Sequence, residues 1–350
     1  MSSDTAVAQE IASDAAGASV ATVAPDFPLV DIAPFLAPDG SPLAAQRGAT
    51  ALAWDSAMRE WGFARVTGHQ IDPDLVARLR ADVLNFFDLS LEEKRRYSDP
   101  SGRYGPEGYT AVGIESVGRT STAAGTTGGA LPDLVENLVL RGGPIETAEE
   151  LGERSRFPPS LQRLTGEYWK QLERTLGALH AMTALALGED VALFDGAYRG
   201  TQANALRMAH YPAMPADKPV LSGQMRYGAH TDYQGYTLLM QDPLVGGLEV
   251  FRPPNGTYPG GWSAVPPGGL VVNAGDLVEL WVNGRWRSAM HRVGNSALAK
   301  RRLSLAFFTG PRGDARIEPI VREGEEARFE AVIAGEHLAR KLAVSNVGNL

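Results

Sequence analysis

Two histidines and one aspartate have the spacing of a metal site. His230 and Asp232 stand two apart in the stretch 227–233, which reads Tyr-Gly-Ala-His-Thr-Asp-Tyr. Side chains two apart in an extended strand point to the same side, so an imidazole and a carboxylate can face one point. His291 lies further along the chain in the alternating stretch 288–293 and can supply the third ligand. Two imidazoles and one carboxylate leave coordination positions on Fe(II) open for O2 and a substrate.

A second pair of polar residues, Arg302 and Ser304, is also two apart, at the start of the apolar stretch 302–308. A guanidinium fork with a hydroxyl beside it suits a carboxylate, which it can hold through two parallel charge-assisted hydrogen bonds. The order His-x-Asp, distant His and Arg-x-Ser resembles the 2-oxoglutarate and Fe(II)-dependent oxygenases of the isopenicillin N synthase-like branch. Each motif alone is a weak signal, so the prediction depends on their order and spacing. The resemblance covers residues 27–342.

The resemblance implies a co-substrate site and a reaction. In that family 2-oxoglutarate chelates Fe(II) through its keto-acid end, and Arg302, Ser304 and Tyr211 are expected to hold its far carboxylate. Tyr211 belongs to the stretch 206–212, which resembles the family's Asn-Tyr-Tyr-Pro motif except that Ala209 and His210 replace Asn and the first Tyr. O2 then converts 2-oxoglutarate to succinate and CO2 while a C–H bond is oxidised, and hydroxylation is the expected outcome. Because Asp232 is intact, halogenation is not expected.

The substrate side of the site is predicted from two stretches. Residues 98–133 are rich in glycine, and in relatives the stretch that resembles 108–113 lies against the substrate. Arg207 shares a strand face with Tyr211. The candidates for substrate contact are therefore Arg103, Tyr104, Tyr109 and Arg207. Residues 120–130 are small and can bury little area, so a mobile lid is expected there; the alternative is an ordinary surface loop.

Two alternatives keep the metal but change the function. Isopenicillin N synthase uses its Arg-x-Ser for the carboxylate of its peptide substrate, so a 2-oxoglutarate-independent Fe(II) oxidase or cyclase remains open. A protein of another class, a non-catalytic metal-binding jelly roll or a zinc hydrolase, could use the same ligands. The remaining histidines are expected to be structural: His69, His180, His210 and His337. Of the basic residues that crowd around His291, only Arg302 is expected to bind a ligand.

The composition is typical of a globular protein and agrees with an enzyme that acts on small molecules. The chain has 350 residues, 44% of them hydrophobic and 21% charged, and no run approaches the about 18 apolar residues of a membrane span. A net charge of −8 argues against nucleic acid or an anionic membrane as a partner. The absence of cysteine excludes disulfides and thiolate sites. We expect a cytoplasmic enzyme of secondary metabolism with a small natural-product or amino-acid-derived substrate; oligomeric state stays open.

The elements that position these residues follow from periodicity. Helices are predicted over 43–61, from about 73 to 87 with Asp72 as cap, and over 161–187. Short strands are predicted over 27–32, 61–69, 205–211, 225–229, 236–241, 247–251, 262–265, 270–273, 278–281, 286–293 and 302–308. Many short strands with turn signals indicate a mostly β fold, a double-stranded β-helix (jelly roll) with an N-terminal α/β cap and a long supporting helix. The predicted segments are a disordered tail over 1–25, an N-terminal α/β region over 26–145, scaffold helices over 146–200 and a catalytic jelly-roll domain over 201–345.

Overall fold

The computed structural model describes residues 24–99, 107–118, 131–143, 156–198, 203–215, 217, 220–254 and 258–345. The larger of its sheets has the order β1 (Leu29–Asp31), β2 (Phe63–Thr67), β10 (Leu270–Ala274), β7 (Tyr236–Met240), β12 (Arg302–Phe308), β5 (Ala205–Tyr211), β4 (Glu136–Arg141) and β3 (Gly108–Thr110). The smaller sheet has the order β6 (Tyr227–His230), β11 (His291–Val293), β8 (Leu248–Arg252) and β9 (Gly261–Ala264). A ribbon joins β13 (Arg316–Ile317) to β14 (Val332–Ile333).

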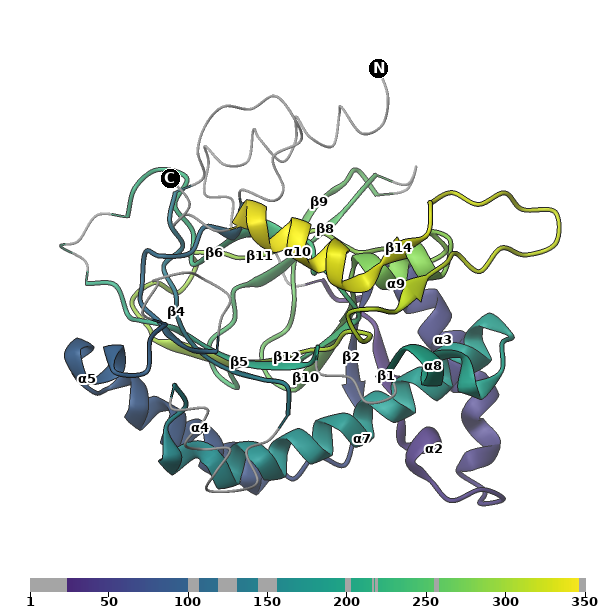
Figure 1. The fold of residues 1–350 in the computed structure, drawn as a ribbon, viewed down its shortest axis with the longest axis horizontal. Coiled ribbons are helices and arrows are strands. Elements are labelled where there is room, and N and C mark those ends of the chain that lie inside the picture. The colour runs from purple at the N-terminus through teal and green to yellow at the C-terminus, as the bar shows by residue number, and fades with distance from the viewer. Residues whose placement is uncertain are drawn as a thin grey trace.

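The two main sheets lie one above the other and form the predicted double-stranded β-helix (Figure 1). Along strand β12, alternate residues point to opposite faces of the sheet. Leu303, Leu305 and Phe307 belong to the main hydrophobic core. Arg302 and Ser304, on the alternate positions, line a cavity between the sheets. Because both faces of this strand are covered, polar residues on the inner face are buried and available only to a ligand inside the barrel.

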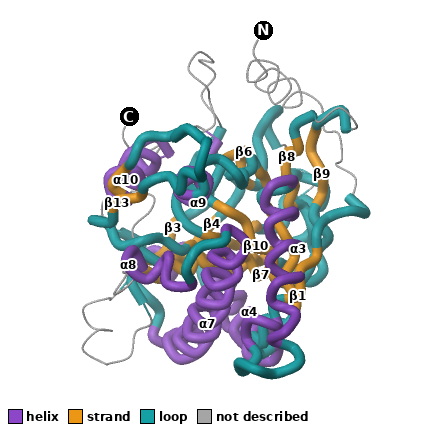
Figure 2. Tube along the Cα trace, turned by 90° about the vertical axis from the view of Figure 1, so that its right-hand side faces the viewer, coloured by secondary structure: helices purple, strands orange, loops and turns teal. Residues whose placement is uncertain are grey.

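Helices cover the outer face of the larger sheet (Figures 1 and 2). They are α3 (Arg47–Glu60), α4 (Pro73–Phe87) and the long α7 (Gln162–Leu187), close to the predicted ranges. On α7, Trp169 packs edge-on against Phe307 of β12 with ring centroids 4.9 Å apart. The predicted cap of α4 is confirmed, because the Asp72 carboxylate accepts a hydrogen bond from the Asp74 amide.

The remaining helical elements are short or peripheral. They are α2 (Ala33–Leu36), α5 (Leu91–Arg95), α8 (Asp195–Tyr198), α9 (Asp276–Trp281), α10 (Ala334–Ser345) and the 3-10 turns Ala44–Gln46, Pro159–Leu161 and Val191–Phe194. In the described part of the chain, no helix is long and apolar enough to cross a membrane.

One predicted strand is wrong and another is shorter than expected. The stretch 278–281 is not a strand but part of helix α9. Its first amides find acceptors in another loop: the Asp276 amide donates to the Asp232 carbonyl at 2.8 Å and the Leu277 amide to the Gln234 carbonyl at 3.1 Å. A short apolar run does not distinguish strand from helix by periodicity, and this tertiary contact decides it. Of the strand predicted over 286–293, only the end forms β11.

Several expectations lie outside the described residues. They concern the tail up to residue 23, the predicted lid 120–130, Arg103 and Tyr104.

Candidate metal centre and co-substrate cavity

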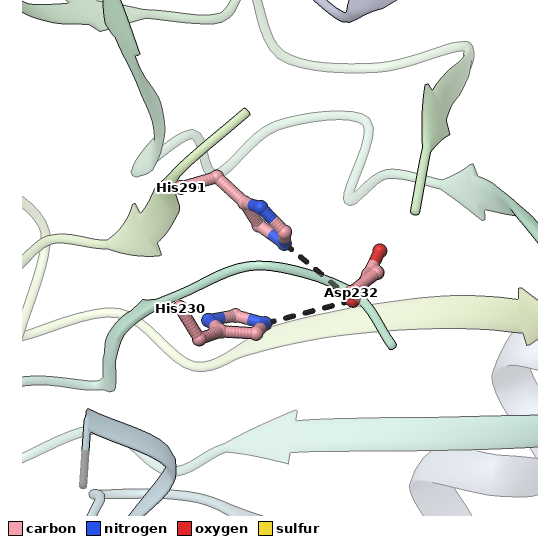
Figure 3. A group of neighbouring side chains, drawn as sticks. All are labelled: His230, Asp232 and His291. Atoms are coloured by element: carbon pink, nitrogen blue, oxygen red, sulfur yellow. Dashed lines mark ion pairs between the residues drawn. The ribbon is translucent and has the colours of Figure 1, made fainter. Parts of the chain in front are cut away.

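His230, Asp232 and His291 come together at one end of the smaller sheet. His230 ends β6 and pairs directly with His291, which begins β11. The Nε2 atoms of His230 and His291 lie 3.7 Å and 3.8 Å from Asp232 Oδ1, as the dashed lines in Figure 3 mark. One ligand atom from each residue lies within 4.8 Å of the others, and all three side chains are buried. The predicted metal ligands therefore converge on one point.

The opposite edge of each imidazole is held by backbone. Nδ1 of His230 lies 2.9 Å from the Gly228 carbonyl, and Nδ1 of His291 lies 3.0 Å from the Ala289 carbonyl. An Nδ1–H that donates to a carbonyl leaves the Nε2 lone pair free for a metal. Burial lowers the pKa of His230 to about 3, so this imidazole is neutral at physiological pH, as a ligand must be.

The carboxylate of Asp232 is oriented in the same way. Its Oδ2 accepts hydrogen bonds from the Thr237 hydroxyl at 2.6 Å and from the Asn273 amide at 2.7 Å. Burial by itself would raise the pKa of Asp232. The imidazoles of His291 and His230 and these two hydrogen bonds have the larger opposite effect, so the pKa lies below the usual value for aspartate. Oδ1 of the ionised group faces the imidazoles. Three donor atoms of the kinds that Fe(II) uses are thus presented together, and the residues fit this metal.

The loop that carries Asp232 is fixed by close backbone packing against the start of α9. The Gly275 amide donates to the Gly235 carbonyl at 2.8 Å, next to the two α9 bonds described above. A Cβ on Gly275 would lie 2.7 Å from the carbonyl oxygens of Gln234 and Gly235. Only glycine allows this approach without displacing the loop.

We expect Asn273→Ala to weaken metal binding without unfolding the protein. Removing the amide leaves Asp232 Oδ2 with one donor fewer, and loss of such a partner typically costs about 10- to 100-fold in metal affinity. Calorimetric titration of the metal-free protein with Mn(II) measures the change. Gln241→Ala is the control, because that amide donates to the Pro266 carbonyl and does not contact the ligands. Equal Mn(II) affinity in Asn273→Ala and wild type would contradict the assignment.

One cavity joins the metal ligands to the predicted carboxylate anchor. Arg302, Ser304 and Tyr211 line it together with His230, Asp232 and His291. Arg302 is only 1% exposed; its Nη1 donates to the Ser304 hydroxyl at 3.2 Å, and its guanidinium lies 4.9 Å from the centre of the Tyr211 ring. Register explains the contact, because Arg302 on β12 pairs with Tyr211 on β5. Among the described residues, Arg302 Nε has no hydrogen-bond partner.

A second cavity opens from the same metal ligands in another direction. It shares His230 and Asp232 with the first cavity but extends to Leu338 and Leu342 of α10. Its apolar walls include Val117, Val139 and Phe308. The ligand cluster therefore lies at a junction between two cavities, one of which contains the carboxylate anchor.

Arg207 lines both cavities and belongs to a buried polar network. Its Nε donates to Asn137 at 2.7 Å, its Nη1 to the Tyr227 hydroxyl at 2.6 Å and its Nη2 to Glu115 at 2.9 Å. The Tyr227 hydroxyl also donates to Glu115, at 2.5 Å. The strand pattern of the sequence indicates Arg207 but not Glu115, because an acidic residue in an irregular loop carries no spacing signal. The pairing with Glu115 compensates the charge of Arg207.

Asp133 is a second residue that the sequence pattern does not indicate. Its carboxylate links the loop before β4 to β6, the strand that carries His230. Its carboxylate accepts from the Gly228 amide at 2.9 Å and from the Val117 amide at 2.8 Å. Burial, together with the nearby Glu115 carboxylate, raises the pKa of Asp133 to about 8. This contact holds Val117, a wall of the second cavity, beside β6.

The structure does not bring Tyr109 to either cavity. Tyr109 is buried in the main core and its hydroxyl donates to Glu136 at 2.6 Å, so a substrate contact stays a prediction without support from this placement. The other histidines have structural surroundings: His210 stacks on Phe87, and His180 stacks on Phe194.

The remaining two histidines, and three of the basic residues near His291, have partners other than the three metal ligands. His69 Nδ1 accepts from the Ile71 amide, and His337 lies on α10 near Asp276. Three of the basic residues have acidic partners; these pairs are Arg285 with Asp55, Arg292 with Glu249 and Arg301 with Asp88.

Comparison with known proteins gives matches along most of the chain. Residues 202–311 match the 2OG-Fe(II) oxygenase superfamily, and residues 27–146 match the family described as non-haem dioxygenase in morphine synthesis N-terminal. The chain is 32% identical to validamycin A dioxygenase of Streptomyces hygroscopicus subsp. limoneus over 90% of its own length and 85% of that protein. It is also 32% identical to a homoarginine-6-hydroxylase of Oryza sativa subsp. japonica, over 84% and 88% of the two chains.

Among solved structures, the fold is similar to that of a full-length Neurospora crassa protein crystallised in complex with alpha-KG. The TM-score is 0.71 at 28% identity, and the match covers 93% of this chain and 99% of that one. A crystal structure of JOX2 in complex with 2OG, Fe and JA shares the fold with a TM-score of 0.70 at 23% identity, over 97% and 94% of the chains.

Proposed function

Since the chain belongs to the 2OG-Fe(II) oxygenase superfamily, we propose that Arg302, Ser304 and Tyr211 bind the distal carboxylate of 2-oxoglutarate beside the iron. The protein is a 2-oxoglutarate and Fe(II)-dependent dioxygenase with Fe(II) held by His230, Asp232 and His291. The observation that carries the proposal is the cavity that joins these ligands to a buried arginine lacking a carboxylate partner among the described residues.

Each protein group has a distinct task in this reaction. When bound, Fe(II) would supply the redox chemistry by which O2 oxidises a C–H bond, and this oxidation is coupled to the conversion of 2-oxoglutarate to succinate and CO2. Arg302 and Ser304 orient the co-substrate by holding its far end, so that its keto-acid end points to the ligand cluster. The apolar walls of the second cavity exclude water from the C–H bond that is to be oxidised.

The substrate we propose is a small polar molecule, hydroxylated at a carbon that faces the cluster from the second cavity. Two features support this substrate class. Three relatives are named for validamycin A, homoarginine and proline, against one named for thebaine, and another structure of the Neurospora crassa protein holds thymine. Arg207, held by Glu115 and Asn137, brings a guanidinium to the lining that the two cavities share.

The stoichiometry of the reaction tests this function. Iron-loaded protein is incubated with O2, 2-oxoglutarate and a panel of amino acids, aminocyclitols and pyrimidines, and products are measured by mass spectrometry. We expect one hydroxylated product and about one succinate per turnover, as hydroxylation coupled to decarboxylation requires. Product formed without 2-oxoglutarate or succinate would instead support the co-substrate-free oxidase. Iron binding without O2 consumption on any substrate of this class would support the non-catalytic alternative.

A further inference from the structure

A second buried arginine, Arg226, lies just before the metal-binding strand β6. Its side chain is 1% exposed. Its Nη2 donates to the Lys300 carbonyl, while Nε and Nη1 have no hydrogen-bond partner among the described residues. Burying the N–H groups of a charged guanidinium without acceptors is unfavourable, so unpaired donors of this kind indicate a missing acceptor.

Arg226 and Arg302 are neighbours. Lys300, whose carbonyl Arg226 contacts, stands two residues before Arg302, and the Arg226 amide donates to the Asn295 side chain of the same β11–β12 loop at 3.0 Å. Burial, and then the charge of Arg302, lowers the pKa of Arg226, whereas Tyr211 acts in the opposite direction. Arg226 therefore lies beside the β11–β12 loop that leads into Arg302, the arginine of the proposed co-substrate anchor.

The charges around this pair do not balance within the described residues. The acid that acts on Arg226 is Asp242, and its carboxylate is already used. It forms an ion pair with Arg80 at 2.8 Å and accepts from the Leu303 amide at 3.0 Å. Arg226 and Arg302 therefore place two positive charges in a buried region without a carboxylate of their own. An anion bound between them would satisfy both the charge and the free donors.

We propose that Arg226 is a second arm of the 2-oxoglutarate site, donating from Nε and Nη1 to the distal carboxylate that Arg302 and Ser304 hold from the other side. The inference rests on the proposed function and adds a residue that the Arg-x-Ser pattern does not include. Two guanidinium groups on one carboxylate make the site selective for a 2-oxo acid with a terminal carboxylate. A 2-oxo acid that lacks this group gains nothing from Arg226.

The test compares two ligands that differ at one end. Anaerobic Fe(II)-loaded protein is titrated by calorimetry with 2-oxoglutarate and with 2-oxopentanoate, which keeps the keto-acid end and lacks the distal carboxylate. For Arg226→Met we expect 2-oxoglutarate affinity to fall on the order of tenfold to hundredfold, the effect of losing charge-assisted hydrogen bonds. Affinity for 2-oxopentanoate should stay unchanged.

The controls separate this role from a structural one. Arg301→Met, which removes an exposed arginine paired with Asp88, should bind both ligands as the wild type does. Arg226→Lys keeps the charge with one donor group and should lie between wild type and Arg226→Met for 2-oxoglutarate alone. The proposal is overturned if 2-oxoglutarate affinity is unchanged in Arg226→Met, if both ligands weaken equally, or if both Arg226 variants fail to fold. Wild-type protein that does not prefer 2-oxoglutarate over 2-oxopentanoate would overturn the proposed function itself.

Discussion

His291→Ala should abolish stoichiometric iron binding and turnover, which is the largest effect that we expect from a single substitution. The side chain is one of three ligands, and its Nε2 lies 3.8 Å from Asp232 Oδ1 in the buried cluster. Loss of an outer hydrogen-bond partner already costs about 10- to 100-fold in metal affinity, so loss of a ligand should exceed that. Metal analysis after anaerobic loading and desalting measures the iron retained, and an O2-consumption assay measures turnover.

The same result is expected for His230→Ala and Asp232→Ala, and the other histidines provide matched controls. His69→Ala and His180→Ala remove an imidazole that accepts from the Ile71 amide and one that stacks on Phe194, both away from the ligand cluster. Both variants should retain iron. Normal iron content and turnover in His291→Ala would show that the metal site has been assigned to the wrong residues.

Arg302→Lys should reduce the affinity for 2-oxoglutarate by roughly ten- to hundredfold, because a point charge replaces a planar fork and one charge-assisted hydrogen bond is lost. The prime substrate should bind with nearly unchanged affinity, since Arg302 lines the first cavity and not the second. Titration with 2-oxoglutarate and succinate production measure the effect. If the variant instead weakened substrate binding while 2-oxoglutarate had no influence on either protein, Arg302 would be a substrate anchor.

The two cavities differ in how their arginines are compensated. In the first cavity, Arg302 has no acidic partner among the described residues, and its Nε has no acceptor there. At the junction, Arg207 is paired with Glu115 at 2.9 Å. Because a buried charge without a partner is unfavourable, Arg302 favours an anionic ligand in the first cavity, whereas Arg207 is already compensated. This difference supports our proposal that 2-oxoglutarate binds in the first cavity.

The sequence alone was sufficient to predict which residues share a face of one strand or one helix. The two-residue spacing of Arg302 and Ser304 predicted a shared face, and β12 places both in the cavity. The long helix and the cap at Asp72 likewise follow from local periodicity and local hydrogen bonding. These features depend on backbone geometry within a few residues, and that geometry is the same wherever the strand or helix lies in the fold.

Only the tertiary structure decided the features whose partners are distant in sequence. The stretch 276–281 becomes a helix because its first amides donate to carbonyls in the loop that carries Asp232. Glu115 meets Arg207, and Arg226 meets the Lys300 carbonyl of the β11–β12 loop, only because the fold brings these distant segments together. Burial, charge compensation and hydrogen-bond satisfaction are properties of the assembled fold, and no spacing rule along one segment contains them.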